Sequence, residues 1–402
     1  MTLVSKTYWM GMPFWFRRPP EGADVESLVL RAHDMRQLRA LWWHRGTPKV
    51  GVVVIHPRVD FAHHYSIPRL LDAGYGVLAA TARHAGNDTL HEYEEVVLDV
   101  AACVRYLREK RGIDKVVLLG NCGGGSLVAY YQAQARLAAA ERITRTPAGS
   151  PTYFEGAPML PADAMVYVVP HRGLGKMMLE AIDPSVVDER DPLSVDPELD
   201  MYDPRNGFRE PPAWSEYDPA FLARYRAAQR ARVERLDAYA RDRIASRQAG
   251  SARAKVSEEI MVVYRTMANP AFVDRNVEPS ERDYGSLLSE RPDLMNYAAL
   301  GFGRTATPRA WLSTWSGLTS HADLVANVAR IAEPTLLVAA GRDREIYPSD
   351  IAAIERAIAA TDKRVETIAA ARHYFEPEAG QHDGHVEAVM DLIVPWIAER
   401  FA

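Results

Sequence analysis

The chain has 402 residues, of which 48% are hydrophobic and 25% are charged, and its formal net charge is −5. These values are typical of a folded globular protein that is longer than one compact core, so a core with a large insertion or a second domain is expected. The mildly acidic balance gives no argument for nucleic acid or a membrane surface as a partner.

Two cysteines, Cys103 and Cys122, are too few for a disulfide framework, and Cys103 lies inside a predicted helix, so no bridge between them is expected. The aromatic stretch 8–16 is too short, and too interrupted by Gly and Pro, for a signal peptide or a membrane span. We therefore expect a cytoplasmic protein. This stretch or an exposed helix of the insertion is a candidate homodimer contact.

In its first half the chain alternates between predicted strands and helices. Strands are expected at residues 27–32, 37–43, 49–55, 76–80, 115–119 and 164–169. Helices are expected at 66–73 and 92–108, and after Cys122. Most of the strands are continuous apolar runs, which is typical of strands covered on both faces. The pattern predicts a mostly parallel, doubly wound α/β sheet.

The alternation of predicted strands and helices stops after Pro170 and resumes with a predicted strand at 334–340. The residues between are rich in Pro, Asp and Arg, with an arginine-rich helical stretch at 221–247. An insertion of roughly 160 residues is too long for a plain loop, so 171–330 is predicted to be a helical cap. The core is predicted to comprise 1–170 and 331–402. Its last elements are expected at 349–360 (helix), 363–368 (strand) and 385–401 (helix).

Cys122 lies in the run Gly120-Asn-Cys-Gly-Gly-Gly-Ser126, between a predicted strand and a predicted helix. This is the pattern of a nucleophile elbow, with a thiol in the place of the usual serine. Gly120 and Gly124 are expected to crowd together, so both must be small. The N-terminal amides of the following helix can bind an oxyanion and favour a thiolate. The alternative is a glycine-rich turn with a buried structural cysteine.

A nucleophilic thiol needs a base beside it and an acid that orients the base. Asp343 follows the predicted strand at 334–340, and His373 follows the predicted strand at 363–368. The chain order of nucleophile, acid and histidine, each after its own strand, is that of a hydrolase triad. Cys122, Asp343 and His373 are therefore the predicted catalytic residues.

Three other residues compete for the acid and base roles. Asp350 lies inside the next predicted helix, where an early-turn charge explains it better. His382 and His385 compete with His373, and His382-Asp-Gly-His385 also has the form of a pair of metal ligands. Because no further ligand with a recognisable spacing accompanies this pair, neither a metal nor a cofactor is expected.

With these motifs in place, the chain resembles the α/β-hydrolase superfamily over its predicted core. A cysteine nucleophile on that fold resembles dienelactone hydrolases, and Gly-x-Cys-x-Gly-Gly resembles polyhydroxyalkanoate synthases. The run Arg372-His-Tyr-Phe-Glu376 departs from the Gly-His-Ile-Gly context of the synthase histidine. The elbow also resembles that of uncharacterised bacterial hydrolases with serine at position 122, so a native thiol and an introduced Ser-to-Cys change both fit. The resemblance implies an α/β-hydrolase fold.

The oxyanion hole is expected to combine the backbone N–H of Gly123 with one from the loop that follows the strand at 49–55. Pro57 has no N–H, so Arg58 or Val59 must donate, and we favour Arg58.

Other side chains are candidates for contact with substrate, namely His56, His63, His64, Trp311 and Trp315. Structural histidines and packing within the cap explain them equally well. The basic stretch 221–255 is a candidate for docking a carboxylate or the phosphates of a coenzyme A thioester, although a solvated helix explains it as well.

The thiol narrows the expected chemistry. A thiolate attacks esters and thioesters readily but also leaves readily from the tetrahedral intermediate, which disfavours amides. We therefore predict a hydrolase that cleaves an ester, lactone or thioester of a small-molecule acyl substrate through an acyl-cysteine. The principal alternative is an acyltransferase that passes the acyl group to an alcohol. A non-catalytic binding module is the alternative from another class.

Overall fold

The computed structural model describes residues 14–16, 18–377 and 384–401. Its centre is an eight-stranded sheet with the order β1-β2-β4-β3-β5-β6-β9-β10. The strands are β1 (Asp24–Arg31), β2 (Gln37–His44), β3 (Val50–His56), β4 (Gly76–Thr81), β5 (Lys115–Asn121), β6 (Ala164–Val168), β9 (Thr335–Ala340) and β10 (Lys363–Ile368). The β1–β2 and β2–β4 pairings are antiparallel, and all the others are parallel. The predicted doubly wound, mostly parallel sheet is confirmed.

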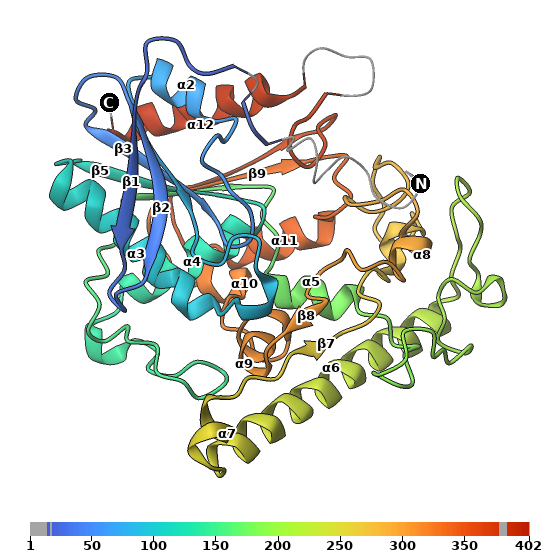
Figure 1. Cartoon of the computed structure of the whole chain (residues 1–402). Coiled ribbons are helices and arrows are strands. Elements are labelled where there is room, and N and C mark those ends of the chain that lie inside the picture. The colour runs from blue at the N-terminus through green and yellow to red at the C-terminus, as the bar shows by residue number, and fades with distance from the viewer. Residues whose placement is uncertain (1–13, 17, 378–383, 402) are drawn as a thin grey trace.

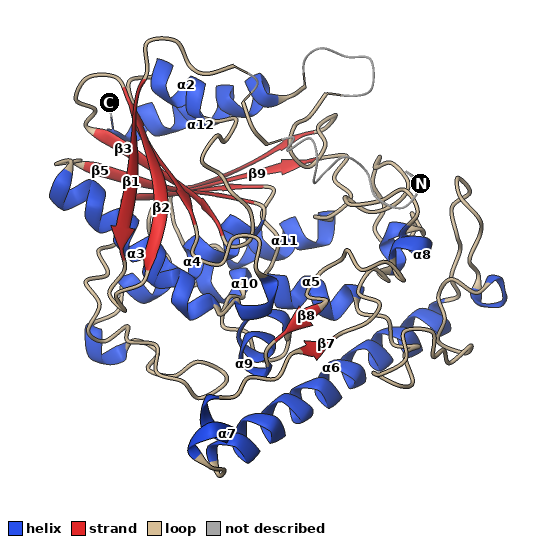
Figure 2. Ribbon diagram, in the orientation of Figure 1, coloured by secondary structure: helices blue, strands red, loops and turns tan. Residues whose placement is uncertain are grey.

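Helices cover both faces of this sheet (Figures 1 and 2). Along β3, Val53 and Ile55 pack in one core cluster with α3 (Tyr93–Lys110) and α4 (Gly123–Ala135). The alternate residues, Val52 and Val54, pack in a second cluster with α2 (Ile67–Asp72) and α12 (Val386–Phe401). Because successive strand side chains point to opposite faces, a strand between two helical layers needs an unbroken apolar run. No helix in the described ranges is long and apolar enough to cross a bilayer.

Between β6 and β9 the chain forms a mainly helical insertion. Its helices are α5 (Leu174–Ala181), α6 (Pro219–Gln248), α7 (Ala252–Val256), α8 (Pro292–Met295), α9 (Pro308–Ala310) and α10 (Leu324–Val328). The short strands β7 (Met261–Val262) and β8 (Thr305–Ala306) pair with each other, outside the central sheet. The long helix α6 crosses below the sheet in Figure 1. These elements occupy the segment predicted as a cap.

A π-helical turn, Trp311–Trp315, joins this insertion to the start of α3 through buried polar contacts. Ser313 Oγ accepts from the backbone N–H of Tyr93 (2.9 Å) and donates to Glu94 Oε2 (2.5 Å). Thr314 Oγ1 donates to the carbonyl oxygen of His91 (2.7 Å). Buried hydrogen bonds of this kind are costly to break, because each group would lose its partner away from water. The turn therefore fixes one side of the insertion to the core.

Candidate active site

Cys122 stands between β5 and α4, where the chain reverses from strand to helix. Its backbone has φ 52° and ψ −123°, a conformation that is strained for a residue with a side chain. The N–H of Cys122 donates to the carbonyl oxygen of Val168 (3.0 Å), which fixes the turn to the neighbouring strand. The local geometry is that of the predicted nucleophile elbow.

The elbow needs glycines, but the contacts differ in part from those predicted. A Cβ at Gly120 would lie 2.6 Å from Gly125 Cα, so Gly120 crowds mainly against Gly125 and not Gly124 alone. A Cβ at Gly124 would instead lie 2.6 Å from the carbonyl oxygen of Ile55 in β3. Both contacts are with backbone, which cannot move aside as a flexible side chain does.

The His64 side chain is hydrogen-bonded to Asn121, the residue before Cys122. Its Nε2 donates to Asn121 Oδ1 (2.9 Å), and its Nδ1 contacts Ser66 Oγ (2.8 Å). Burial lowers the pKa of His64 to about 4, so the ring is neutral at physiological pH. Asn121 Nδ2 in turn donates to the carbonyl oxygen of Val168 (3.0 Å). The expected substrate contact of His64 does not fit this position, because the ring is committed to the turn.

Asp343 and His373 meet at the carboxyl edge of the sheet, after β9 and β10. His373 Nδ1 lies 2.8 Å from Asp343 Oδ2, and both side chains are almost completely buried. The other carboxylate oxygen, Oδ1, accepts from the backbone N–H groups of Glu345 (2.8 Å) and Ile346 (3.1 Å). The carboxylate is thus fixed by two amides and can hold the imidazole in one orientation.

Cys122 lies close enough to His373 to affect its charge. Burial lowers the pKa of His373, but the charges of Asp343 and Cys122 outweigh burial and raise the pKa well above its ordinary value. A hydrogen bond with the Cys122 thiol contributes to this rise, and no other partner of the buried Nε2 is found within the described chain. The structure therefore brings the three predicted residues together, and a ring nitrogen is left available to exchange a proton.

The competing residues occupy other places. Asp350 lies in the first turn of α11 (Pro348–Ala357), where Oδ2 accepts from the backbone N–H of Tyr347 (3.0 Å), and Arg172 lies 3.6 Å from Oδ1. This is the early-turn position expected for it. His385 immediately precedes α12, and its Nδ1 is buried without a partner among described residues. His382 falls outside the described residues.

The backbone N–H of Arg58, which was predicted as the second oxyanion donor, has another hydrogen-bond partner. The backbone N–H groups of Arg58 and Val59 both donate to His56 Nδ1, at 3.0 and 3.1 Å. Arg58 N–H is therefore engaged within its own loop, and its assignment to the oxyanion hole does not fit the structure. Gly123 is the first residue of α4, so its N–H has no partner within the helix.

A small pocket of about 20 Å³ lies beside Cys122, with room for about one water molecule. It is lined by His56, Arg58, Val59, Cys122, His171, Leu174, Met177, Leu287, Leu288, Phe302 and Glu345. The apolar side chains other than Val59 come from the insertion, and the polar ones come mostly from loops at the strand ends. Of the five side chains predicted to contact substrate, His56 is among these lining residues.

The other predicted contacts pack elsewhere. His63 lies among Trp15, Phe16 and Trp43. Trp311 is fully buried, and its Nε1 donates to Asp237 Oδ1 (2.8 Å). These two positions are explained by packing.

Trp315 is also fully buried, and the Arg58 guanidinium lies 5.2 Å from its ring centroid. The same guanidinium lies 5.5 Å from the Phe302 ring and binds both carboxylate oxygens of Asp88 (2.7 and 2.6 Å). Trp315 therefore supports a residue of the pocket wall.

Sequence reasoning missed His171 and Glu345. His171 follows β6 just as Asp343 follows β9, so the position of polar residues after strands would have found it. Glu345 is two residues from Asp343, is buried, and its Oε2 has no partner within the described chain. Burial raises the pKa of Glu345 to about 8, so this carboxyl is mostly protonated at neutral pH.

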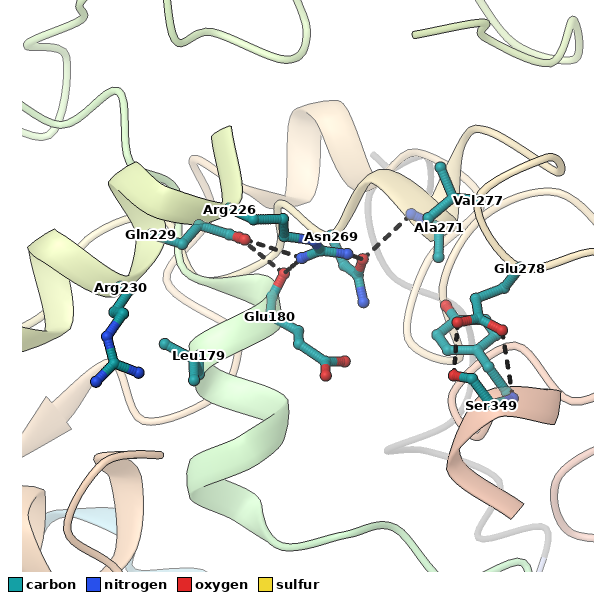
Figure 3. Close-up of a pocket in the computed structure, with 11 residues that line it drawn as sticks. Leu179, Glu180, Arg226, Gln229, Arg230, Asn269, Ala271, Val277, Glu278 and Ser349 are labelled. Carbon is teal, nitrogen blue, oxygen red and sulfur yellow. Dashed lines mark hydrogen bonds between the residues drawn. The ribbon is translucent and has the colours of Figure 1, made fainter. Parts of the chain in front are cut away.

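A larger pocket, of about 450 Å³, lies between α5, α6 and the start of α11 (Figure 3). Arg226 spans one wall, where it contacts the carbonyl oxygen of Glu180, Gln229 Oε1 and Asn269 Oδ1, each at 2.8 Å. On another wall Ser349 Oγ donates to Glu278 Oε1 (2.6 Å). None of the predicted triad residues lines this pocket. Across the described ranges, no group of three or more His, Cys, Asp or Glu residues is arranged to hold a metal ion.

No protein-family model matches this sequence, and no curated protein sequence matches it. Several solved structures are similar to it at low sequence identity. DcsB, solved in complex with its substrate analogue, has a TM-score of 0.53 at 11% identity, covering 94% of this chain and 99% of that chain. Est1E from Butyrivibrio proteoclasticus has a TM-score of 0.46 at 13% identity, covering 93% and 98%. The Pyrococcus furiosus esterase Pf2001 has a TM-score of 0.45 at 12% identity, covering 94% and 92%.

The chain has the α/β-hydrolase fold. Three features agree with that fold. They are the mostly parallel sheet, the sharp turn after β5, and the polar residues after β9 and β10. The predicted fold class is confirmed.

The glycine contacts of the elbow predict that Gly120→Ala destabilises the protein. Its Cβ would meet the backbone of Gly125, so we expect a loss of about 1–3 kcal/mol in the free energy of unfolding, measured by chemical denaturation. Gly51→Ala, in β3, is the control, because its Cβ would meet only side-chain atoms, of Ile113 and Leu107, at 3.1 Å. Equal losses in the two variants would contradict this account of the elbow.

The buried Glu345 predicts a dependence of stability on pH. Its pKa is higher in the folded chain, at about 8, than the ordinary value of 4.5, so the folded state favours the proton. This contribution is fully present below the unfolded pKa and is lost as the pH rises through about 8. Between pH 5.5 and 8.5 the parent should therefore lose up to about 3 kcal/mol relative to Glu345→Gln. Chemical denaturation at both pH values measures this, and an identical pH dependence would refute it.

Proposed function

We propose that the protein hydrolyses esters, lactones or thioesters of small acyl substrates through Cys122, His373 and Asp343. The observation that carries this proposal is the arrangement at the sheet edge. Asp343 lies 2.8 Å from His373 Nδ1, a hydrogen bond with Cys122 helps to raise the pKa of His373, and Cys122 occupies the strained elbow. A nucleophile, a base and a residue that orients the base are the parts that covalent acyl transfer needs.

Because the pKa of His373 is raised well above its ordinary value, Nε2 already holds the proton of Cys122 when acylation begins, and the thiolate attacks the carbonyl carbon of the substrate. A C–S bond forms as the carbonyl π electrons move to oxygen, which gives a tetrahedral oxyanion. When the carbon–oxygen double bond reforms, the alcohol or thiol leaves and takes the proton from His373. Asp343 keeps the ring in one orientation and stabilises the imidazolium until this transfer.

Deacylation repeats the sequence with water. His373 removes a proton from the water as its oxygen attacks the acyl carbon, and the C–S bond then breaks to release the acid. The proton stays on His373, and Cys122 is again a thiolate. The pocket beside Cys122 has room for about one water molecule and is lined by both apolar and polar side chains.

The proposal predicts a pre-steady-state burst with p-nitrophenyl acetate. The parent should release one equivalent of p-nitrophenolate per chain, and mass spectrometry should find acetyl on the Cys122 peptide. Cys122→Ala should show neither signal. Asp343→Asn should slow acylation by about 10³-fold or more, because the ring loses its orienting carboxylate.

Asp350→Asn is the matched control, since it makes the same change in another buried carboxylate, in the first turn of α11, and it should acylate at the parent rate. A second control is iodoacetamide labelling, in which Cys122 should react faster than a thiol of the denatured chain while the buried Cys103 stays unlabelled. Slow labelling of Cys122 together with no burst would indicate a non-catalytic binding module.

Acyl transfer is distinguished from hydrolysis by the product. The parent is incubated with a short acyl thioester, with and without an alcohol acceptor. We expect the free acid in both reactions, and ester in excess over free acid would make the protein an acyltransferase. A panel of p-nitrophenyl esters, lactones and acyl-coenzyme A thioesters, tested on the parent and on Cys122→Ser, then ranks the substrate classes. A serine variant that is faster on all of them would identify the thiol as an introduced change.

A further inference from the structure

Two buried imidazoles other than His373 lie over the elbow, and the proposed triad uses neither. His56 is the last residue of β3, and His171 follows β6. These strands flank β5 on its two sides, so the rings approach Cys122 from opposite directions. Both residues line the pocket next to Cys122.

The partners of each ring at Nδ1 determine where its proton lies. His56 Nδ1 accepts from the backbone N–H groups of Arg58 (3.0 Å) and Val59 (3.1 Å). His171 Nδ1 accepts from the backbone N–H of Gly173 (3.1 Å). Because a backbone amide can only donate, Nδ1 must be unprotonated in both rings, and the proton of each neutral ring is on Nε2.

Both rings are neutral at physiological pH. Burial lowers the pKa of His56 well below its ordinary value, and it lowers the pKa of His171 to about 3. In each case the charge of His373 lowers the pKa further, which also shows that these rings lie near the proposed base. Each ring is therefore a neutral donor at Nε2 and cannot take a proton there.

The two Nε2 atoms converge above Gly123. A Cβ placed on Gly123 would lie 2.8 Å from His56 Nε2 and 3.0 Å from His171 Nε2. His56 Nε2 is buried and has no hydrogen-bond partner in the described part of the chain. A buried donor without an acceptor is costly, so it indicates a place for an acceptor that the free protein does not supply.

We propose that His56 Nε2–H and His171 Nε2–H, together with the backbone N–H of Gly123, form the oxyanion hole of this site. The acceptor would be the carbonyl oxygen of the bound acyl group, which becomes negative when Cys122 adds to the carbon. Side-chain donors from β3 and β6 take the place that the loop amide of Arg58 was predicted to fill. This inference rests on the proposed function, because an oxyanion forms only if Cys122 is acylated.

Asparagine separates the donor role of each histidine from its structural role. In His56→Asn and His171→Asn, Oδ1 can still accept from the loop amides that Nδ1 accepts from, but no donor reaches the position of Nε2. We expect each variant to lower the acylation rate constant with p-nitrophenyl acetate by about 100-fold, measured by stopped flow. The rate of alkylation of Cys122 by iodoacetamide should stay at the parent value, because that reaction generates no oxyanion.

Gly123→Ala tests the same donors with both histidines in place, so that misfolding of an asparagine variant does not decide the matter. Its methyl group would lie within 3.0 Å of both Nε2 atoms and displace them, while the backbone N–H remains. Acylation should fall and alkylation should persist.

His44→Asn is the control. His44 ends β2, beside the start of β4, and therefore lies at the opposite edge of the sheet from Cys122.

The outcomes separate the two proposals. If the parent shows no acylation, the proposed function fails, and the oxyanion hole fails with it. If the parent acylates but His56→Asn, His171→Asn and Gly123→Ala acylate at the parent rate, the function stands and the imidazole donors are refuted. If acylation and alkylation fall together in these variants, the histidines act on the thiolate or the fold, and the inference is overturned. Selective loss of acylation supports it.

Discussion

Three imidazole rings surround Cys122, and the partner that each ring meets at Nδ1 fixes what its Nε2 can do. His373 Nδ1–H donates a hydrogen bond to Asp343, which leaves Nε2 to face the Cys122 thiol. Backbone amides donate to Nδ1 of His56 and His171, which leaves a proton on each Nε2. The same type of side chain thus supplies one proposed base and two proposed hydrogen-bond donors.

The sheet brings these rings together. The adjacent strands β4, β3, β5, β6, β9 and β10 run parallel to one another, so their carboxyl ends lie along the same side of the sheet. Residues from four different strand ends then surround Cys122 at the end of β5, although they are far apart in sequence. Glycines at the elbow let the backbone of α4 approach β3 closely enough for this to occur. The site is a property of the topology more than of any one segment.

Most of the central sheet could be predicted from the sequence, because strands buried on both faces read as continuous apolar runs. Cys122 and Asp343 were predicted because each follows such a run, whereas His373 was predicted from its place after β10, an edge strand that is partly exposed. The position of the backbone N–H of Arg58 could not be predicted, because its hydrogen bond depends on the rotamer of His56. Inside the insertion, Trp311 is buried against Asp237, and aromatic composition alone cannot distinguish such packing from a substrate wall.

The π-helical turn Trp311–Trp315 has a consequence for how a substrate enters. Its serine and threonine bind buried groups at the start of α3, including Glu94, whose other oxygen faces Tyr130 and His321. Lifting the whole insertion away would break these buried hydrogen bonds together, and each group would need new partners from water. Leu287 and Leu288 line the pocket beside Cys122 from another part of the insertion, so a change in their positions would widen the pocket without breaking the hydrogen bonds of the turn.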